Sequence, residues 1–574
     1  MSFVLLAIQE LIYVQVLEAE AGQALRFVHD KLSETIYARL PSQRRRELHA
    51  IAVRALEASH GDADMSARYA ELAFHWEQAG QPEQAAQYWA RAGVQALKAT
   101  SYIDAVQHFE AALRNALDTH FINDKLLLAR WTRCLGEAYY SAGDVEKGEA
   151  HLAQSLKLFG LGWPHERNDK LALLLGELSR QLLPARVAHV LQRGRALLSA
   201  QDRADAALAA ERLAFILLWR RDSLATVAST ALAVNLIDEL QGDKPTTRPH
   251  SLLAFMAGLA RIKPLERKYF RRARELGART PPSDYAYSLF LESYLRAGEG
   301  NWASAKALSD KGLCVLDPQE ALILRDATAI LGFVARTRGD YSAALNHAAT
   351  LRRSAREAGN REHEIWSEVL EGSCWVRSLK YERAREHLER ARSLLEQAPE
   401  WVCQLRSYAQ LAHAHFGMGR RPQAVALAAS GLDVLRQHHG PPLLVSSIDA
   451  VMSLAHVHIE LWRECATDVS RESFARESLA YLARLALVFP VARAYYLLCA
   501  GRFHATLGRK RRAQLLLVLA GRSANALQLP YEQALIAWHK AHLFEDERAL
   551  WAERAHRYFA KFGNVLTSSM LAPG

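Results

Sequence analysis

A turn followed by the start of a helix recurs along this chain at intervals of about 40 residues, and this period limits the possible folds more than any other feature. It is clearest in segments 300–305 (GNWASA), 339–344 (GDYSAA), 379–384 (LKYERA) and 419–424 (GRRPQA), each of which ends in alanine. Because a helical hairpin buries its apolar face only by stacking on its neighbours, the period predicts an all-α solenoid of hairpins.

Small residues at fixed positions of the repeat let two antiparallel helices cross closely, while large residues one turn away fill the groove between them. A glycine at the turn suits the left-handed conformation that ends a helix. The residues that we expect to pack or turn the repeat are Gly136, Gly143, Ala85, Ala344, Ala384, Ala424 and Ala513.

Segment 72–92 (LAFHWEQAGQPEQAAQYWARA) carries the same frame, and with the later copies it resembles the tetratricopeptide repeat. The period exceeds the usual tetratricopeptide unit of about 34 residues and is similar to that of the bacterial maltose-operon activator and its relatives. The resemblance implies a tetratricopeptide-like helical-hairpin solenoid preceded by a small helical N-terminal unit. We carry no peptide-groove residues over from the shorter repeat.

Turn-rich breaks divide the array without forming a long linker. Segment 159–170 contains a Trp-Pro pair, and segment 438–442 reads HHGPP; both compositions stop helices. We expect one continuous solenoid with bends near Trp163 and Pro441. Its predicted parts are a winged-helix-like helical remnant at 1–60, first repeats at 61–160, a central solenoid at 161–440 and C-terminal repeats at 441–574.

The stretch before the first repeat combines a His-Asp pair, a tyrosine and a Leu-Pro step. Residues Leu5, Ile8, Ile12 and Val16 upstream recur at helical spacing. The stretch resembles the segment that closes the nucleotide-binding half of signal-transduction ATPases with numerous domains, which implies the C-terminal portion of such a bacterial protein without its ATPase core. The residues that carry this domain-junction motif are Phe27, His29, Asp30, Leu32, Tyr37, Leu40, Pro41, Arg45, Leu48 and His49.

Catalytic motifs are missing from the sequence. It has no G-x-x-x-x-G-K-[ST] phosphate loop, no H-E-x-x-H and no G-x-S-x-G, so we expect no enzyme activity and no cofactor. The histidine pairs in AHAHFG and AHVHIE stand at i and i+2, on different faces of a helix, and predict no metal site. We interpret His29-Asp30 structurally, with Asp30 capping a helix that begins near Lys31.

Charge suggests a partner only weakly. Lysine and arginine total 72 and aspartate and glutamate 62, a net charge of +10. Arg267, Arg271 and Arg274 share one predicted helix face beside Tyr269 and Phe270, which could meet a phosphate backbone or an acidic protein segment. The alternative is a solvated face balanced by glutamates, and without a helix-turn-helix reader we do not expect a nucleic-acid partner.

Location and function follow from the same features. No apolar stretch reaches the length of a membrane span, and six scattered cysteines are typical of a reduced, cytoplasmic protein. We expect a non-catalytic regulatory or scaffold protein of a signalling system that binds a protein partner or effector through the solenoid surface. One alternative is a subunit of a signalling enzyme whose ATPase, kinase or cyclase domain is on another chain. Another is a transcription regulator that acts through a partner.

Overall fold

The computed structural model describes residues 2–19, 25–59, 67–118, 124–164, 166–182, 198–220, 222–240, 246–316, 321–396, 400–437 and 445–560. The chain forms two compact units, Met1–Trp163 with Gly194–Leu198, and Pro164–Arg193 with Ser199–Gly574. The division falls at Trp163, while Pro441 lies outside the described residues. The four parts proposed above, and the boundaries between them, remain predictions.

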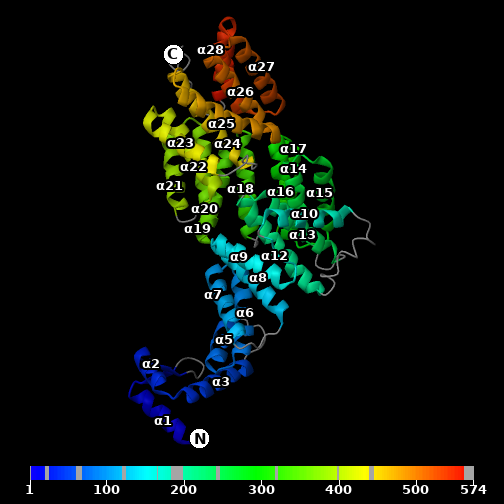
Figure 1. Ribbon diagram of the computed structural model, residues 1–574. Helices are drawn as coiled ribbons and strands as arrows, with labels where there is room; N and C mark the ends of the chain where they lie inside the picture. Colours follow the sequence, from blue (N-terminus) through cyan, green and yellow to red (C-terminus); the bar gives the residue numbers. More distant parts are fainter. Residues whose placement is uncertain are drawn as a thin grey trace. The chain divides into compact units, whose positions relative to one another are not determined.

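The first unit begins with a helix, a two-stranded antiparallel hairpin and two further helices, and continues as helical hairpins (Figure 1). Its elements are α1 (Ser2–Tyr13), β1 (Leu17–Ala19), β2 (Leu25–Phe27), α2 (Asp30–Arg39), α3 (Ser42–Ser59), α5 (Tyr69–Gln78), α6 (Pro82–Lys98), α7 (Tyr102–Asp118), α8 (Lys125–Ala142) and α9 (Val145–Leu158). The first helix ends at Tyr13, so Val16 lies beyond it, just before the hairpin.

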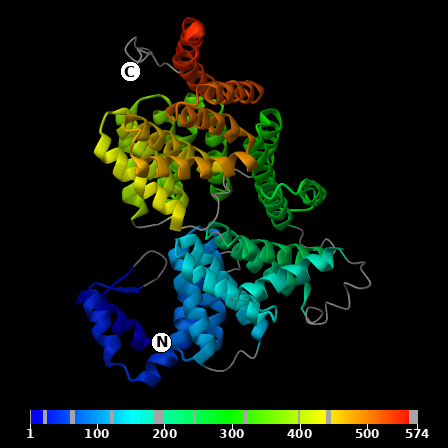
Figure 2. The same cartoon turned by 45° about the horizontal axis from the view of Figure 1, so that its top comes forward.

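The second unit consists of α-helices and two short 3-10 segments in its described part (Figure 2). They are α10 (Arg167–Leu182), α12 (Ala200–Trp219), α13 (Ser223–Asp238), α14 (Arg248–Leu259), α15 (Lys263–Leu276), α16 (Pro282–Glu299), α17 (Trp302–Val315), α18 (Ala321–Thr337), α19 (Tyr341–Glu357), α20 (Arg361–Arg377), α21 (Tyr381–Leu395), α22 (Trp401–Gly417), α23 (Arg421–Gln437), η1 (Val445–Ser447), α24 (Ile448–Glu464), α25 (Val469–Val488), α26 (Pro490–Thr506), α27 (Lys510–Ala526), α28 (Pro530–Leu543), η2 (Glu545–Glu547) and α29 (Arg548–Ala560). From α12 onward they pair as antiparallel hairpins, so the predicted all-α hairpin solenoid is confirmed.

Most repeat turns contain a residue in the left-handed conformation, and in several of them a side-chain cap follows it. Gly143 has φ 95° and ends α8, and the Asp144 carboxylate then accepts a hydrogen bond from the Lys147 N–H at the start of α9. Gly339 and Asp340 repeat this arrangement between α18 and α19. Leu379 takes the same place with φ 57° although it is not glycine. The sequence period therefore follows the positions at which the backbone must turn left-handed.

The small residues of the repeat are buried at helix crossings. A Cβ on Gly136 would lie 2.9 Å from the Leu152 side chain of α9, so only glycine fits there. The predicted alanines are fully buried on the second helices of their hairpins: Ala85, Ala344, Ala384, Ala424 and Ala513.

The solenoid of the second unit curls back on itself. Trp302 Nε1 at the start of α17 donates a hydrogen bond to the Leu527 carbonyl oxygen after α27, at 2.7 Å. A Cβ on Gly298 would lie 2.8 Å from both Phe489 and Val445, so α16 meets the start of α26 at very close range. These contacts join residues more than a hundred positions apart, and they place the inner faces of α16 to α28 around a common interior.

Candidate functional site

The first helices of successive hairpins form the inner wall of the second unit, because α18, α20, α22, α24, α26 and α28 each contact the next in the series. A groove of about 650 Å³ lies along α22, α24, α26 and α28. We call it the C-terminal groove and define it by Tyr381, His413, Phe416, Arg421, His456, Glu460, Arg463, Arg502, Ala505, Tyr531, Leu535, Trp538, His539 and His542.

Helix α22 shows how the sequence builds this wall. Gln410, His413 and Phe416 follow one another at helical spacing and face the interior, so one stripe of the helix lines the space at successive depths. At the end of α22 a Cβ on Gly417 would lie 2.2 Å from the Tyr381 ring. The glycine therefore lets Tyr381 close one side of the groove.

Two histidines from neighbouring hairpins stack on one another in the groove. The rings of His413 and His456 have centroids 4.4 Å apart. Burial, reinforced by Arg502 and Arg377, lowers the pKa of His413 to about 3. Burial, His413 and Arg502 lower the pKa of His456 well below its ordinary value. Both rings are therefore neutral at physiological pH, and each carries one donor and one acceptor nitrogen.

The spacing of the histidines within each motif did not predict that His413 and His456 would pair. His413 and His456 belong to the two similar motifs AHAH and AHVH, about one repeat apart in the chain. That equivalence was the available signal, because residues at the same place in consecutive repeats become neighbours when hairpins stack. The described residues contain no cluster suited to hold a metal ion.

A charged pair stands beside the stacked rings. Arg502 Nη1 donates a hydrogen bond to His456 Nδ1 at 2.8 Å, and the same guanidinium forms an ion pair with Glu460. Burial lowers the pKa of Arg502 to about 9, so the side chain remains cationic at neutral pH. Arg463, also paired with Glu460 at 2.8 Å, is much more exposed. The groove thus offers a fixed cation and a carboxylate side by side.

Aromatic groups complete the groove. The Arg421 guanidinium lies 3.9 Å from the centroid of the Phe416 ring, where it stacks on the aromatic face. Trp538 Nε1 is buried and no described residue accepts its hydrogen bond. A partner that supplied a carbonyl oxygen would satisfy this donor.

A buried ionic layer lies next to the groove and joins four inner helices. The Asp449 carboxylate pairs with Arg336 of α18 and, at 3.0 Å, with Arg377 of α20, and Arg377 in turn lies 3.2 Å from Glu532 of α28. Burial by itself raises the pKa of Asp449, but Arg336 and Arg377 outweigh it and hold the pKa below its ordinary value. The layer is therefore charged, and ion pairs link each arginine to a carboxylate, while Arg336 Nε, Arg377 Nη1 and Glu532 Oε2 have no hydrogen-bond partner among the described residues.

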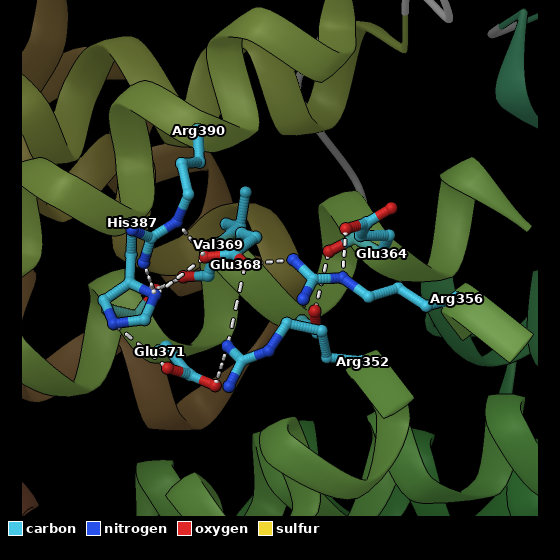
Figure 3. Close-up of polar contacts among 10 residues, drawn as sticks. Arg352, Arg356, Glu364, Glu368, Val369, Glu371, His387 and Arg390 are labelled. Carbon is cyan, nitrogen blue, oxygen red and sulfur yellow. Dashed lines mark hydrogen bonds and ion pairs between the residues drawn. The ribbon is translucent and has the colours of Figure 1, made fainter. Parts of the chain in front are cut away.

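A second charged cluster connects α19, α20 and α21 (Figure 3). Glu368, almost completely buried, lies between His387 Nδ1 at 2.7 Å and Arg390 Nε at 3.3 Å on one side and Arg352 at 3.6 Å on the other. Glu371 Oε2 meets the other nitrogen of His387 at 3.1 Å. Because α19 and α21 both bind carboxylates of the helix between them, the cluster fixes the register of consecutive hairpins.

Two perturbed carboxyls of this cluster invite a catalytic interpretation. Burial opposes ionisation of Glu368, but His387 and Arg390 outweigh it and lower its pKa, while burial raises the pKa of Glu371. Opposite shifts in neighbouring acids are typical of acid–base sites. Here, however, Arg352 and His387 each pair with both Glu368 and Glu371. The cluster is therefore a structural ion-pair network.

The three arginines of the predicted basic face on α15 do not share one environment. Arg274 Nη1 pairs with Glu292 at 2.7 Å, whereas Arg267 and Arg271 are exposed and form no ion pair with a described residue. Tyr269 and Phe270 point into the core, being 4% and 2% exposed. The face therefore lacks the aromatic surface on which bases would stack.

The junction motif forms a small polar contact in the first unit. Tyr37 Oη lies 2.9 Å from His49 Nε2, and His49 Nδ1 lies 2.8 Å from His75 Nδ1, which links α2, α3 and α5. Burial and the neighbouring His75 lower the pKa of His49. Phe27 ends β2, and Leu40 follows α2.

The expectation for Asp30 was wrong in detail. Helix α2 begins at Asp30 itself, and the residue before it, His29, takes the cap position without a side-chain hydrogen bond. An acidic residue in the first turn still interacts favourably with the helix dipole.

Three buried thiols of the second unit are held in the protonated form. Burial raises the pKa of Cys374 to about 12 and that of Cys403 and Cys499 above the ordinary range, so the thiols stay protonated. In the part of the chain that the structure covers, every helix is too short or too polar to cross a bilayer.

No known protein-family model and no curated protein matches the sequence. Among solved structures, a Rap protein complexed with Competence and Sporulation Factor aligns over 62% of this chain and 98% of its own, with 13% identity and a TM-score of 0.46. The apo form of RapI aligns over 63% and 97%, with 11% identity and a TM-score of 0.38. Yeast Tom70 aligns over 83% and 96%, with 13% identity and a TM-score of 0.31.

These scores are low, so the fold assignment depends on the chain's own hairpins, their left-handed turns and their buried small residues. On that basis the chain is an all-α helical-repeat protein built from tetratricopeptide-like hairpins.

Proposed function

We propose that this protein is a non-catalytic regulatory scaffold that binds a segment of a partner protein in the C-terminal groove. The observation that carries the proposal is the groove itself, a space of about 650 Å³ bounded by four inner helices. Solenoids bind through concave surfaces of this kind.

The groove has the chemistry of a peptide site. A polypeptide backbone carries alternating donors and acceptors. The neutral His456 ring accepts from Arg502 at Nδ1, so its Nε2–H is left to donate to a backbone carbonyl. Trp538 Nε1 lacks an acceptor, and Arg502 offers a cation that is already oriented by His456 and Glu460. Aromatic side chains such as Phe416 supply apolar contact area with little entropy to lose.

Catalysis is not part of this proposal. The strongly shifted groups of the second unit include histidines kept neutral, thiols and tyrosines kept protonated, and Glu362, whose pKa burial raises to about 7. We identify no pairing of a nucleophile with a base among them. The proposed cytoplasmic location and the place in a signalling system depend on the sequence alone. The junction motif from Phe27 to His49 supports them through its resemblance to signal-transduction ATPases.

Selection of random peptides on the immobilised full chain tests the groove. Ala505 lines the groove on α26, so Ala505→Trp should fill it and weaken selected peptides at least tenfold, which corresponds to about 1.4 kcal/mol. Leu515→Trp is the matched control, because Leu515 is 59% exposed on α27 and does not line the groove. Equal loss in both variants, or none in Ala505→Trp, would refute the site. ATP turnover by the pure chain would refute the non-catalytic role.

A further inference from the structure

A second cavity, of about 180 Å³, lies in the interior of the same unit and shares no lining residue with the C-terminal groove. Inner helices α12, α14, α16, α18, α20 and α22 surround it, and η1 contributes Ser446. We call it the aromatic cavity. Its rings include Phe215, Phe255, Tyr287, Phe290, Phe333 and Trp366.

The walls of the aromatic cavity are well fixed. Tyr294 Oη accepts a hydrogen bond from the Ser446 N–H at 2.8 Å, and the Tyr294 ring packs edge-on against Phe333 at 5.4 Å. Phe255 stacks on the other side of Tyr294 at 6.2 Å. Protein interiors are close-packed, and rings held in this way do not collapse into the space between them.

One cation lines this apolar space without a partner. Arg406 of α22 is 7% exposed, its Nε is buried without a hydrogen-bond acceptor, and it forms no ion pair with a described residue. A buried charge is normally paired, because desolvation is costly. A guanidinium stays protonated at neutral pH, so the group that would suit it is an acceptor that carries negative charge.

The carboxylates near the cavity are already occupied. Asp326 accepts a hydrogen bond from His363 Nε2 at 2.8 Å. Glu400 caps α22, and its two oxygens accept the N–H groups of Val402 at 2.7 Å and Cys403 at 2.8 Å. Neither side chain forms an ion pair with Arg406: burial raises the pKa of Glu400, and the Arg406 charge opposes that rise only at longer range. The guanidinium therefore keeps hydrogen-bond donors for an external anion.

We propose that the aromatic cavity binds a small carboxylic acid with a single-ring aromatic body, its ring among the aromatic side chains and its carboxylate on Arg406. The size is suitable, since an apolar cavity of roughly 150 Å³ holds a benzene molecule. This inference goes beyond the partner groove, because it assigns a separate site and another class of ligand to the protein.

Calorimetric titration of the full chain with phenylacetate tests the site, with phenylacetamide as the neutral probe of the same shape. We expect saturable one-to-one binding of phenylacetate and binding of the amide at least tenfold weaker. Arg406→Met should weaken phenylacetate at least tenfold and leave the amide unchanged. Ala329 lines the cavity on α18, so Ala329→Phe should fill it and abolish both.

Circular dichroism and thermal unfolding establish that each variant is folded. Equal affinity for the acid and the amide, or full retention of phenylacetate by folded Arg406→Met, would overturn the role of Arg406. Absence of saturable phenylacetate binding up to about 10 mM would overturn the site, since a Kd above that concentration corresponds to a binding free energy weaker than about 3 kcal/mol. The peptide test of the C-terminal groove uses other variants, so the two proposals can fail separately.

Discussion

Removing the charge of Asp449 should destabilise the second unit more than removal of any exposed charge. Asp449 is 6% exposed, and its partners Arg336 and Arg377 are 1% and 7% exposed. Asp449→Asn keeps the shape but leaves two buried guanidinium groups with one carboxylate, that of Glu532, between them. Breaking a buried ion pair costs about 3–5 kcal/mol, and we expect a value in the upper half of that range.

Urea unfolding followed by circular dichroism measures this loss. For a unit of this size the midpoint should fall by roughly 1 M, since m-values rise with the surface exposed. The double variant Asp449→Asn, Arg336→Met should recover at least half of the loss, because it also removes the orphaned cation. Asp310→Asn is the control, as Asp310 is paired with Lys306 on the surface and exposed pairs contribute about 0–1 kcal/mol.

Two results would refute this reasoning. A loss below about 1 kcal/mol in Asp449→Asn would mean that the layer is hydrated or adaptable. A double variant no more stable than the single one would mean that the loss comes from shape rather than from the unpaired charge.

Three further predictions concern packing, acid stability and nucleotides. Ala384→Leu should overpack the crossing of α20 and α21 and lower the free energy of unfolding by about 1–3 kcal/mol, and Ala344→Leu should do the same one repeat earlier. Exposed Glu386→Leu is the control. Unchanged thermal unfolding of both alanine variants would contradict the predicted repeat. Burial lowers the pKa of His413 to about 3 and of His458 to about 4, so below pH 6.5 only the unfolded chain takes up these protons and stability falls as pH falls. The loss should reach about 2 kcal/mol per histidine at pH 5, and a urea midpoint equal at pH 7 and pH 5 would be inconsistent with it. Titration with ATP and magnesium at physiological salt should reveal no specific binding; a saturable, salt-insensitive micromolar affinity would mean that a site was missed, with the exposed arginines of α15 as the first residues to replace.

The sequence determined the fold class because each repeat depends on interactions between residues that are close together in the chain. A left-handed glycine followed by an aspartate cap, as at Gly143 and Asp144, ends one helix and starts the next whatever surrounds it. Gly136 and Ala384 could be placed at helix crossings because a close crossing needs a small residue wherever it occurs. The β-hairpin between α1 and α2 could not be predicted in this way, since its strands are only three residues long.

The candidate binding surfaces were decided by the tertiary structure alone. His413 and His456 each belong to a motif that predicts nothing by itself, and they stack only because hairpins about one repeat apart lie side by side. The sequence does not mark Arg406 out, yet the winding of the solenoid buries it beside aromatic rings from distant hairpins, with no ion pair to a residue that the structure describes. Local propensities set where helices begin and end, whereas the partners of a buried charge depend on which repeats the superhelix brings together.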